Sequence, residues 1–436
     1  MKTNDAAVKS MPLLRIVVAS EHSSARFGGE AALPLHYFRV LRKLGHPVWL
    51  VTHARTRDEL QALFPGETRI HYIEDTHFHR WMWAISRRLP ARIAYFSTGF
   101  ASRFTVQLAQ RRVIRRLVAS EGIEVVHQPM PVSPREPSAL NGFGVPVVIG
   151  PMNGGMEYPP AFRRASAVGG LTSALARTFA ELLNRIVPGK REAAVVLVAN
   201  PRTRAALPRA VRGAVIELVE NGVDLEVFRS RTQDAAASAF DGTSFVYMGR
   251  LVDWKRVDLL LGAHALAARE SRLRLVIVGS GPEEAALRAR AAELGVLAAD
   301  AASPGVEFAG WLSQRACAER LAAADALVLP SIFECGGAVV LEAMAMGKPV
   351  IATAWGGPLD YLDPSCGVLV PPDGEAELER GLAAAMVRLA GDPALRERMG
   401  SAGRAKVLRD YDWDVKVARI LEIHAAAIQA FRSRSA

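Results

Sequence analysis

The stretch Ala326–Thr353, ALVLPSIFECGGAVVLEAMAMGKPVIAT, is the part of the chain that indicates the fold most directly. It runs from an apolar segment through a glycine turn into a short helical pattern, and then into a second apolar segment. A helix that begins after Gly336 and Gly337 would present unpaired backbone N–H groups and a positive dipole end, which suits phosphate. Glu334 and Glu342 bracket the turn with hydrogen-bond acceptors, which suits hydroxyl groups. The stretch therefore predicts a ligand with both kinds of group, such as a nucleotide sugar.

Length and strand pattern predict an α/β protein of two domains. The chain has 436 residues, more than one hydrophobic core usually supports. Short apolar runs alternate with helical patterns, which favours parallel sheets in two Rossmann-like domains that face an interdomain cleft. A polar, Ala-rich segment from Ser230 to Gly242 predicts a linker, with domains at 1–230 and 231–412. The expected strands lie in runs that begin at Leu13, His46, Arg69, Ile123, Val145, Ala193, Val215, Ser244, Leu273, Val306, Ala326, Lys348 and Gly367.

Composition favours a globular protein of the cytoplasm. Half of the residues are hydrophobic and 22% are charged, which is unlike a disordered chain. The three cysteines are scattered, without metal-ligand or disulfide spacing, which favours a reducing compartment. Because Arg15 interrupts the apolar stretch near the N-terminus, we interpret that stretch as a first buried strand and not as a signal peptide.

Positive charge is concentrated in the N-terminal half. Residues 1–200 contain 26 Lys and Arg against 14 Asp and Glu, although the whole chain carries only +10. In the same half, Trp81 and Trp83 stand among arginines such as Arg87. This combination suits an anionic membrane surface, a phosphorylated acceptor or single-stranded nucleic acid. A helix with an apolar inner face and solvated arginines explains it equally well.

Two further loops of the C-terminal half follow expected strands. In GRLVDWK, Arg250 and Lys255 stand on a loop that enters a helix, where two cations could neutralise a diphosphate without a metal. In VGSGPEE, Gly279 and Gly281 form a tight turn before a helix. This turn is either half of a phosphate-binding fingerprint or a simple strand–helix connection.

Candidate residues of the N-terminal half also follow strands. Gly28 and Gly29 open a helix and would let the backbone approach a substrate. His127 ends a strand and would face the expected cleft, although a lone histidine is more often structural. Asn153 and Gly154 belong to the Gly/Pro-rich loop GPMNGGMEYPPAF, which could contact donor or acceptor.

No metal site is expected. Asp412 and Asp414 precede a final helical pattern, where aspartate is a preferred cap. His77 and His79 lack a nearby third ligand and are expected in a loop.

Taken together, these motifs resemble the retaining glycosyltransferases of the GT-B class called family 4, over nearly the whole chain. The strongest signature is PSIFECGGAVVLEAMAMGKPVIAT, and GRLVDWK, VGSGPEE and the Gly28-Gly29 turn follow the family's order. Two positions depart from the family pattern. Cys335-Gly336-Gly337-Ala338 replaces the usual Gly-Phe-Gly, and Arg256 stands where glycine usually follows the lysine.

The resemblance implies a role for each matching residue. Arg250 and Lys255 would hold the diphosphate, and Glu342 would bind the ribose hydroxyls. Glu334 would hold hydroxyls of the donor sugar. His127 would lie near the reacting sugar. Gly336 and Gly337, with the Gly279 and Gly281 turn, would complete the donor site, and the loops of Gly28, Gly29, Asn153 and Gly154 would face the acceptor. A last helix, about 413–434, would pack back on the N-terminal domain.

We therefore expect a metal-independent, retaining hexosyltransferase with no cofactor. It would use a nucleotide-diphosphate sugar and a glycan or lipid-linked acceptor in envelope or exopolysaccharide synthesis. Its setting would be the cytoplasm, with possible attachment to the inner membrane face and no nucleic acid partner. The alternatives are a nucleotide-sugar epimerase, a soluble disaccharide synthase, and a catalytically silent protein that binds membrane or nucleic acid.

Overall fold

The computed structural model describes residues 12–26, 29–89, 95–166, 170–229, 240–300 and 302–435. The chain divides into two compact units. Unit 1 comprises Met1–Gly155, Gly170–Glu220 and Trp413–Ala436, and unit 2 comprises Met156–Gly169 and Asn221–Asp412. The expected linker falls mostly on residues 230–239, outside the described part.

Unit 1 contains a parallel sheet of seven strands in the order β3-β2-β1-β4-β5-β6-β7. The strands are β1 (Ile16–Ala19), β2 (Val48–His53), β3 (Ile70–Ile73), β4 (Val125–Gln128), β5 (Val147–Met152), β6 (Val195–Val198) and β7 (Ala214–Glu217). The helical segments are α2 (Gly29–Lys43), η1 (Ala54–Thr56), α3 (Arg57–Leu63), α4 (His77–Ser86), η2 (Tyr95–Gly99), α6 (Phe100–Glu121), α7 (Gly170–Ile186), α8 (Gly189–Glu192), α9 (Pro201–Ala205) and α17 (Trp413–Ser435).

Both faces of this sheet are buried, as the nearly continuous apolar strands require. Ile16 and Val18 of β1 join a core cluster that includes side chains of α2 and α17. Val17 and Ala19 point to the other face and join a second cluster with α6. The alternation along one strand thus assigns each helix to a face.

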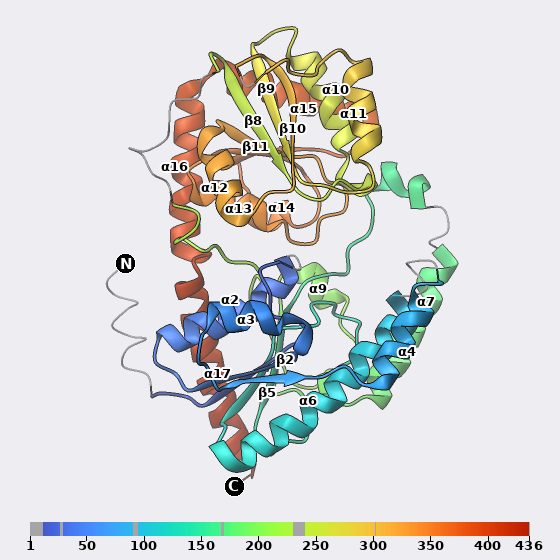
Figure 1. Cartoon of the computed structure of the whole chain (residues 1–436), viewed down its shortest axis with the longest axis vertical. Coiled ribbons are helices and arrows are strands. Elements are labelled where there is room, and N and C mark those ends of the chain that lie inside the picture. The colour runs from blue at the N-terminus through green and yellow to red at the C-terminus, as the bar shows by residue number, and fades with distance from the viewer. Residues whose placement is uncertain are drawn as a thin grey trace. The chain divides into compact units, whose positions relative to one another are not determined.

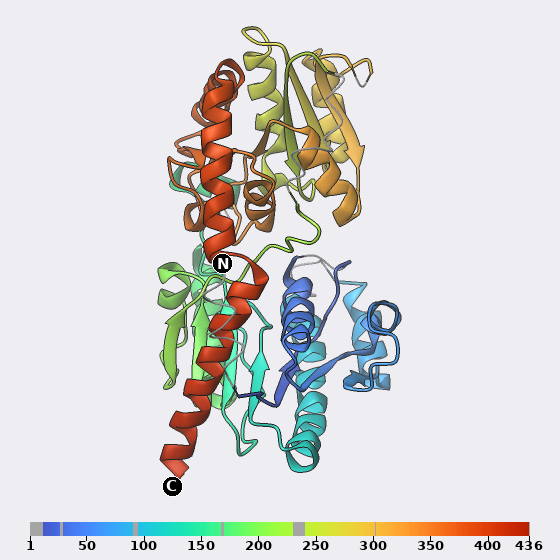
Figure 2. The ribbon, with the colours of Figure 1, turned by 90° about the vertical axis from the view of Figure 1, so that its left-hand side faces the viewer.

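Helix α17 is part of unit 1 although it ends the chain. Trp413, Val417, Ile420 and Leu421 lie in the core cluster that contains α2. Their spacing of three and four residues gives the helix one apolar stripe. Figure 2 shows α17 in red, running past the strands of unit 1 toward the C-terminus.

Unit 2 contains a parallel sheet of six strands in the order β10-β9-β8-β11-β12-β13. Figure 1 shows its strands with α10 and α11 to their right and α12 and α13 to their left. The strands are β8 (Thr243–Met248), β9 (Leu273–Val278), β10 (Gly305–Gly310), β11 (Ala326–Leu329), β12 (Val350–Thr353) and β13 (Gly367–Val370). The helical segments are η3 (Pro160–Ser166), η4 (Asp253–Lys255), α10 (Val257–Ala267), α11 (Glu284–Glu293), α12 (Gln314–Ala323), α13 (Ala338–Ala345), α14 (Pro358–Tyr361), α15 (Glu375–Gly391) and α16 (Pro393–Asp410).

The α/β class and the two Rossmann-like parallel sheets are confirmed, and each apolar run named above overlaps one strand. The grouping of residues differs from the expected boundaries at two places. The second stretch of unit 2 begins at Asn221, whereas the expected boundary was residue 231. The segment Met156–Gly169, which was expected within the first domain, also belongs to unit 2.

Candidate functional site

The sheet of unit 2 has its topological switch point between β8 and β11. From β8 the chain continues to β9 and β10 on one side, and from β11 to β12 and β13 on the other. Ligands of open α/β sheets bind beyond the carboxyl ends of the strands at such a point. The loop after β8 carries Arg250 and Lys255, and the loop after β11 carries Glu334. The residues that the sequence singled out therefore meet at this position.

An ion pair joins these two loops. Lys255 Nζ donates to Glu334 Oε2, and the two side chains are 15% and 13% exposed. The backbone is tied as well, since Ile332 N donates to Trp254 O over 3.0 Å. Each charge compensates the other at a depth where a lone charge would be costly.

Arg250 has an exposed side chain at the same edge of the sheet. No ion pair of its guanidinium with any other residue in the described ranges is found. Its backbone is held, because Tyr247 Oη donates to the Arg250 carbonyl over 3.0 Å. Arg250 thus presents an exposed cation on a fixed backbone.

Gly337 and Gly357, near Glu334, occupy positions where a side chain would be strained or would collide. Gly337 has φ +80°, and a Cβ there would lie 3.1 Å from Glu334 Cγ. Gly357 N donates to Glu334 O over 2.7 Å. A Cβ on Gly357 would overlap the carbonyl of Gly336. Helix α13 begins directly after Gly337, whose lack of a side chain leaves the first N–H groups without a side-chain cap.

Glu342 lies inside α13 and is half-buried. Burial raises the pKa of its carboxyl to about 7. The same carboxylate contributes, after burial, to raising the pKa of Cys317 to about 11. A carboxyl group that is partly protonated near neutral pH can both donate to and accept from ligand hydroxyls.

Gly279 and Gly281 pack the β9 turn against the β8 loop. A Cβ on Gly279, whose φ is +136°, would overlap Gly249 O, and one on Gly281 would overlap Leu251 O. Leu251 N donates to Ser280 O over 3.0 Å. Both glycines are therefore required by packing, because any side chain there would collide with the backbone of the β8 loop.

His127, a candidate of unit 1, lies in the interior of that unit. His127 is 0% exposed, and its Nε2 lies 2.8 Å from Gly150 O. Its ring packs against Tyr37 and His424, with centroids at 4.8 and 5.0 Å. Burial lowers the pKa of His127 to about 4, so the imidazole is neutral at pH 7. The side chain thus lies in the core of unit 1, not on an open face.

The other unit 1 candidates have internal roles or lie outside the described residues. Asn153 Nδ2 donates to Glu220 Oε1 over 2.8 Å, and Gly154 N donates to Thr203 Oγ1 over 3.1 Å. Gly29 is the first residue of α2, and Gly28 is outside the described residues.

Comparison with known proteins finds a family match within the second half of the chain. Residues 230–406 match the family model described as Glycosyl transferases group 1. These residues, which are similar to that family, are called the group 1 region below. The group 1 region contains the whole sheet of unit 2 and the Lys255–Glu334 pair.

Two relatives with known names are similar over part of their length. The D-inositol 3-phosphate glycosyltransferase of Streptomyces bingchenggensis is 36% identical over 236 residues, which are 50% of this chain and 49% of that protein. The GDP-mannose-dependent monoacylated alpha-(1-6)-phosphatidylinositol monomannoside mannosyltransferase of Corynebacterium glutamicum is 34% identical over 223 residues, 48% of this chain and 55% of that protein. The chain spans about half the length of the curated relatives it matches.

Solved structures share the fold of both halves. HepE of Anabaena, solved with UDP, matches with a TM-score of 0.65 at 16% identity, over 95% of this chain and 100% of that one. Sucrose-phosphate synthase of Thermosynechococcus elongatus matches with a TM-score of 0.61 at 20% identity, over 96% and 100%. The fold is therefore the GT-B fold, with the group 1 region as its second half.

Arg256 of the group 1 region was noticed in the sequence only as a departure from glycine. It has φ +49°, a left-handed conformation that non-glycine residues rarely adopt. Its guanidinium pairs with Asp258 at 2.9 Å and Glu375 at 2.8 Å, and it lies over the ring of Phe162 at 5.3 Å. The absence of the usual glycine marks this position in the sequence, but the contacts with Glu375 and Phe162 cannot be predicted from it.

An acidic group at the equivalent switch point of unit 1 was missed as well. Glu21 follows β1, and burial, reinforced by the nearby Glu136 carboxylate, raises the pKa of Glu21 to about 7. Glu136 is bound by Arg103 Nε over 2.7 Å. Single acidic residues outside a motif gave no signal in the sequence.

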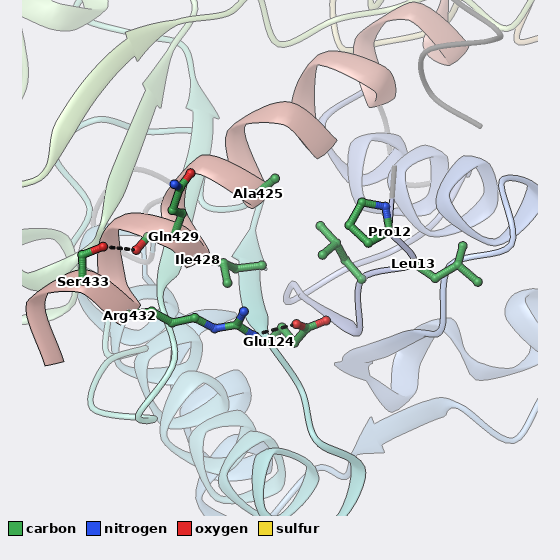
Figure 3. A pocket seen from close by; sticks show the side chains of 9 residues that line it. Pro12, Leu13, Glu124, Ala425, Ile428, Gln429, Arg432 and Ser433 are labelled. Atoms are coloured by element: carbon green, nitrogen blue, oxygen red, sulfur yellow. Dashed lines mark hydrogen bonds and ion pairs between the residues drawn. The ribbon is translucent and has the colours of Figure 1, made fainter. Parts of the chain in front are cut away.

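A pocket of about 360 Å³ lies elsewhere in unit 1. Figure 3 shows Arg432 of α17 and Glu124 pointing toward each other beside it, in an ion pair of 3.0 Å. Pro12, Leu13 and Leu14 line it just before β1, and Glu124 precedes β4. The pocket is thus at the amino edge of the sheet, opposite to the edge where ligands of this fold bind.

The described ranges contain no group of three or more His, Cys, Asp or Glu side chains that could hold a metal ion. His77 and His79, expected in a loop, instead begin α4, where Thr76 and His79 form a capping box. Within these same ranges, no helix has the length and apolar character needed to cross a membrane.

Proposed function

We propose that this chain is a retaining glycosyltransferase that moves a hexose from a nucleotide-diphosphate sugar to an acceptor. The observation that carries the proposal is the meeting of Arg250, Lys255 and Glu334 at the switch point of a group 1 sheet. Cations and backbone N–H groups at this edge suit a diphosphate, and carboxylates beside them suit hydroxyl groups. The names of the similar proteins mention UDP and GDP-mannose, which supports a nucleotide-linked donor.

In this proposal Arg250 and Lys255 stabilise the diphosphate as it leaves, which is where negative charge develops. Glu334 holds hydroxyls of the sugar and Glu342 those of the ribose. Glu342 lies within a helix and is poorly placed to flank the anomeric carbon, so a two-carboxylate glycosidase mechanism is disfavoured. We propose attack on the same face, assisted by the leaving phosphate and without a metal.

Residues of unit 1 enter the proposal as acceptor-side or supporting groups. Glu21 and Glu136, with Arg103 beside them, offer acceptors and a cation at the carboxyl edge of that sheet. Such a set suits a hydroxyl-rich acceptor, and the relatives' names mention inositol phosphate and a phosphatidylinositol mannoside. His127 supports the start of the loop that contains Asn153 through its contact with Gly150.

We also propose that the enzyme acts in the cytoplasm, at the inner face of a membrane that carries a lipid-linked acceptor. The support is the excess of Lys and Arg in residues 1–200 and two tryptophans of α4. Trp81 and Trp83 are 62% and 61% exposed, which is unusual for such large apolar side chains.

The direct test is release of nucleotide diphosphate from UDP-glucose and GDP-mannose, with and without polyol phosphates or lipid-linked glycans. Release that depends on an acceptor supports transfer, whereas a changed sugar without release would indicate an epimerase. Product formation from a free sugar phosphate would indicate a soluble disaccharide synthase. If Lys255→Ala and Glu334→Ala both keep the cellular function, the protein is a binding protein and the enzyme proposal is wrong.

A further inference from the structure

The segment Met156–Arg163, here called the strap, packs in unit 2 although it follows strand β5 of unit 1. The chain leaves unit 1 after Gly155 and returns to it at Gly170. The strap therefore brings side chains from the first half of the sequence to the sheet that carries the donor-site residues.

The first anchor of the strap lies beside Glu334. The rings of Tyr158 and Phe333 have centroids 4.9 Å apart and planes inclined by 33°. Phe333 directly precedes Glu334 in the chain. A ring pair of this kind is stabilising beyond the apolar area that it buries. Tyr158 thus restrains the backbone from which the Glu334 carboxylate projects.

The second anchor lies beside Lys255. Phe162 is 4% exposed, and Arg256 Cζ lies 5.3 Å from its ring centroid. Arg256 directly follows Lys255 and is also held by Glu375. Because Arg256 is restrained in the left-handed conformation, the direction of the preceding Lys255 is restrained with it.

The third anchor joins the strap to the loop after β12. Trp355 Nε1 donates to Glu157 O over 2.8 Å. A Cβ on Gly356 would lie 2.7 Å from Met156 Cε, so the Met156 thioether lies against that glycine. The next residue, Gly357, donates its N–H to Glu334 O. The strap therefore contacts Phe333, which precedes Glu334, and Arg256, which follows Lys255. It also contacts the loop after β12, which donates a hydrogen bond to Glu334 O.

We propose that the strap sets the orientation of the Lys255–Glu334 pair, with Tyr158 positioning Glu334 for the sugar of the donor and Phe162 positioning Lys255 for the diphosphate. This inference rests on the proposed function of the same site. It assigns an effect on sugar binding to Tyr158 and an effect on diphosphate binding to Phe162. A purely structural role of the strap would not separate these two effects.

The test measures dissociation constants by calorimetry for UDP-glucose and GDP-mannose, and for UDP and GDP as probes without the sugar. Tyr158→Ala is expected to weaken binding of the nucleotide sugar about tenfold and that of the free diphosphate less than twofold. Phe162→Leu, which keeps apolar bulk but removes the ring under Arg256, is expected to weaken both by a similar factor. Tyr158→Phe keeps the ring and is expected to bind like the wild type within about twofold.

Thermal unfolding of each variant shows whether it is folded, and Trp355→Phe provides a milder change at the third anchor if Tyr158→Ala is not. Trp355→Phe keeps an aromatic ring but loses the hydrogen bond to Glu157 O. This variant is expected to weaken binding of the nucleotide sugar more than binding of the free diphosphate. Equal loss for both probes in Tyr158→Ala and Trp355→Phe, or no loss in either, overturns the role of the strap while the proposed function stands. A wild-type protein that binds none of the four probes overturns both.

Discussion

Lys255 and Glu334 are 79 residues apart in the chain and form an ion pair in which neither side chain is more than 15% exposed. The pair lies at the switch point of the unit 2 sheet, since Lys255 and Glu334 are on the loops that follow β8 and β11. A ligand that carries both phosphate and hydroxyl groups would meet both charges of the pair at once. The energetics of this pair are therefore the first property to measure.

Glu334→Gln is expected to lower the free energy of unfolding by about 1–3 kcal/mol, because it leaves the Lys255 ammonium partly buried without its counter-charge. Lys255→Met should lower the free energy of unfolding by a similar amount, because it leaves the Glu334 carboxylate without its counter-charge. In the double variant the loss should be clearly smaller than the sum of the two, since no lone charge remains. Urea unfolding of the four proteins measures the coupling, and strictly additive losses would contradict the importance of the pair.

The left-handed backbone of Arg256 predicts that its glycine and alanine variants differ in stability. Arg256→Gly loses the contacts with Asp258, Glu375 and Phe162 but removes the strain of φ +49°. Arg256→Ala loses the same contacts and keeps the strain. The alanine variant should thus be less stable than the glycine variant by about 1–2 kcal/mol. Equal stabilities by denaturant unfolding would show that the backbone relaxes out of the left-handed region.

The carboxyl of Glu342 predicts a pH dependence of stability. Its pKa is about 7 in the folded protein, compared with 4.5 for an ordinary glutamate. The folded state therefore binds more protons than the unfolded state from about pH 4.5 to 7, and this group's contribution to stability falls as pH rises through that range.

Glu342→Gln removes the titration and should flatten this part of the profile. The shift from 4.5 to about 7 corresponds to about 3 kcal/mol, most of which is lost between pH 5 and pH 8. Relative to wild type, the variant should therefore melt several degrees higher at pH 8 than at pH 5. Thermal unfolding at both pH values measures the effect. The prediction fails if the difference between variant and wild type is the same at pH 5 and pH 8.

Membrane docking through α4 predicts salt-sensitive flotation with vesicles that contain phosphatidylglycerol. Exchange of both Trp81 and Trp83 for alanine should reduce the bound fraction at least severalfold, because interfacial aromatics and arginines act together. Trp311 is 69% exposed in unit 2, so Trp311→Ala is a matched control that should bind like the wild type. Wild type that does not float at low salt would rule out this surface.

The sequence was sufficient for the strands and for the common location of Lys255 and Glu334, because both depend on local pattern. The apolar runs mark all the strands of both sheets, and loops that follow neighbouring parallel strands must meet at one edge. The burial of His127 could not be predicted in this way. Its position at the end of β4 suggested an open edge, but Tyr37 of α2 and His424 of α17 cover the ring.

Residue pattern alone determined the α/β class, the order of the elements and the meeting of Arg250, Lys255 and Glu334, because strand periodicity and glycine turns are encoded within a few residues. Only the tertiary structure decided which residues restrain that site. The strap and the contacts of Arg256 with Glu375 and Phe162 join residues more than twenty positions apart in the chain, and the shift of the Glu342 pKa arises from burial by other elements. Such contacts depend on how whole helices and loops pack, and no short stretch of sequence carries that information.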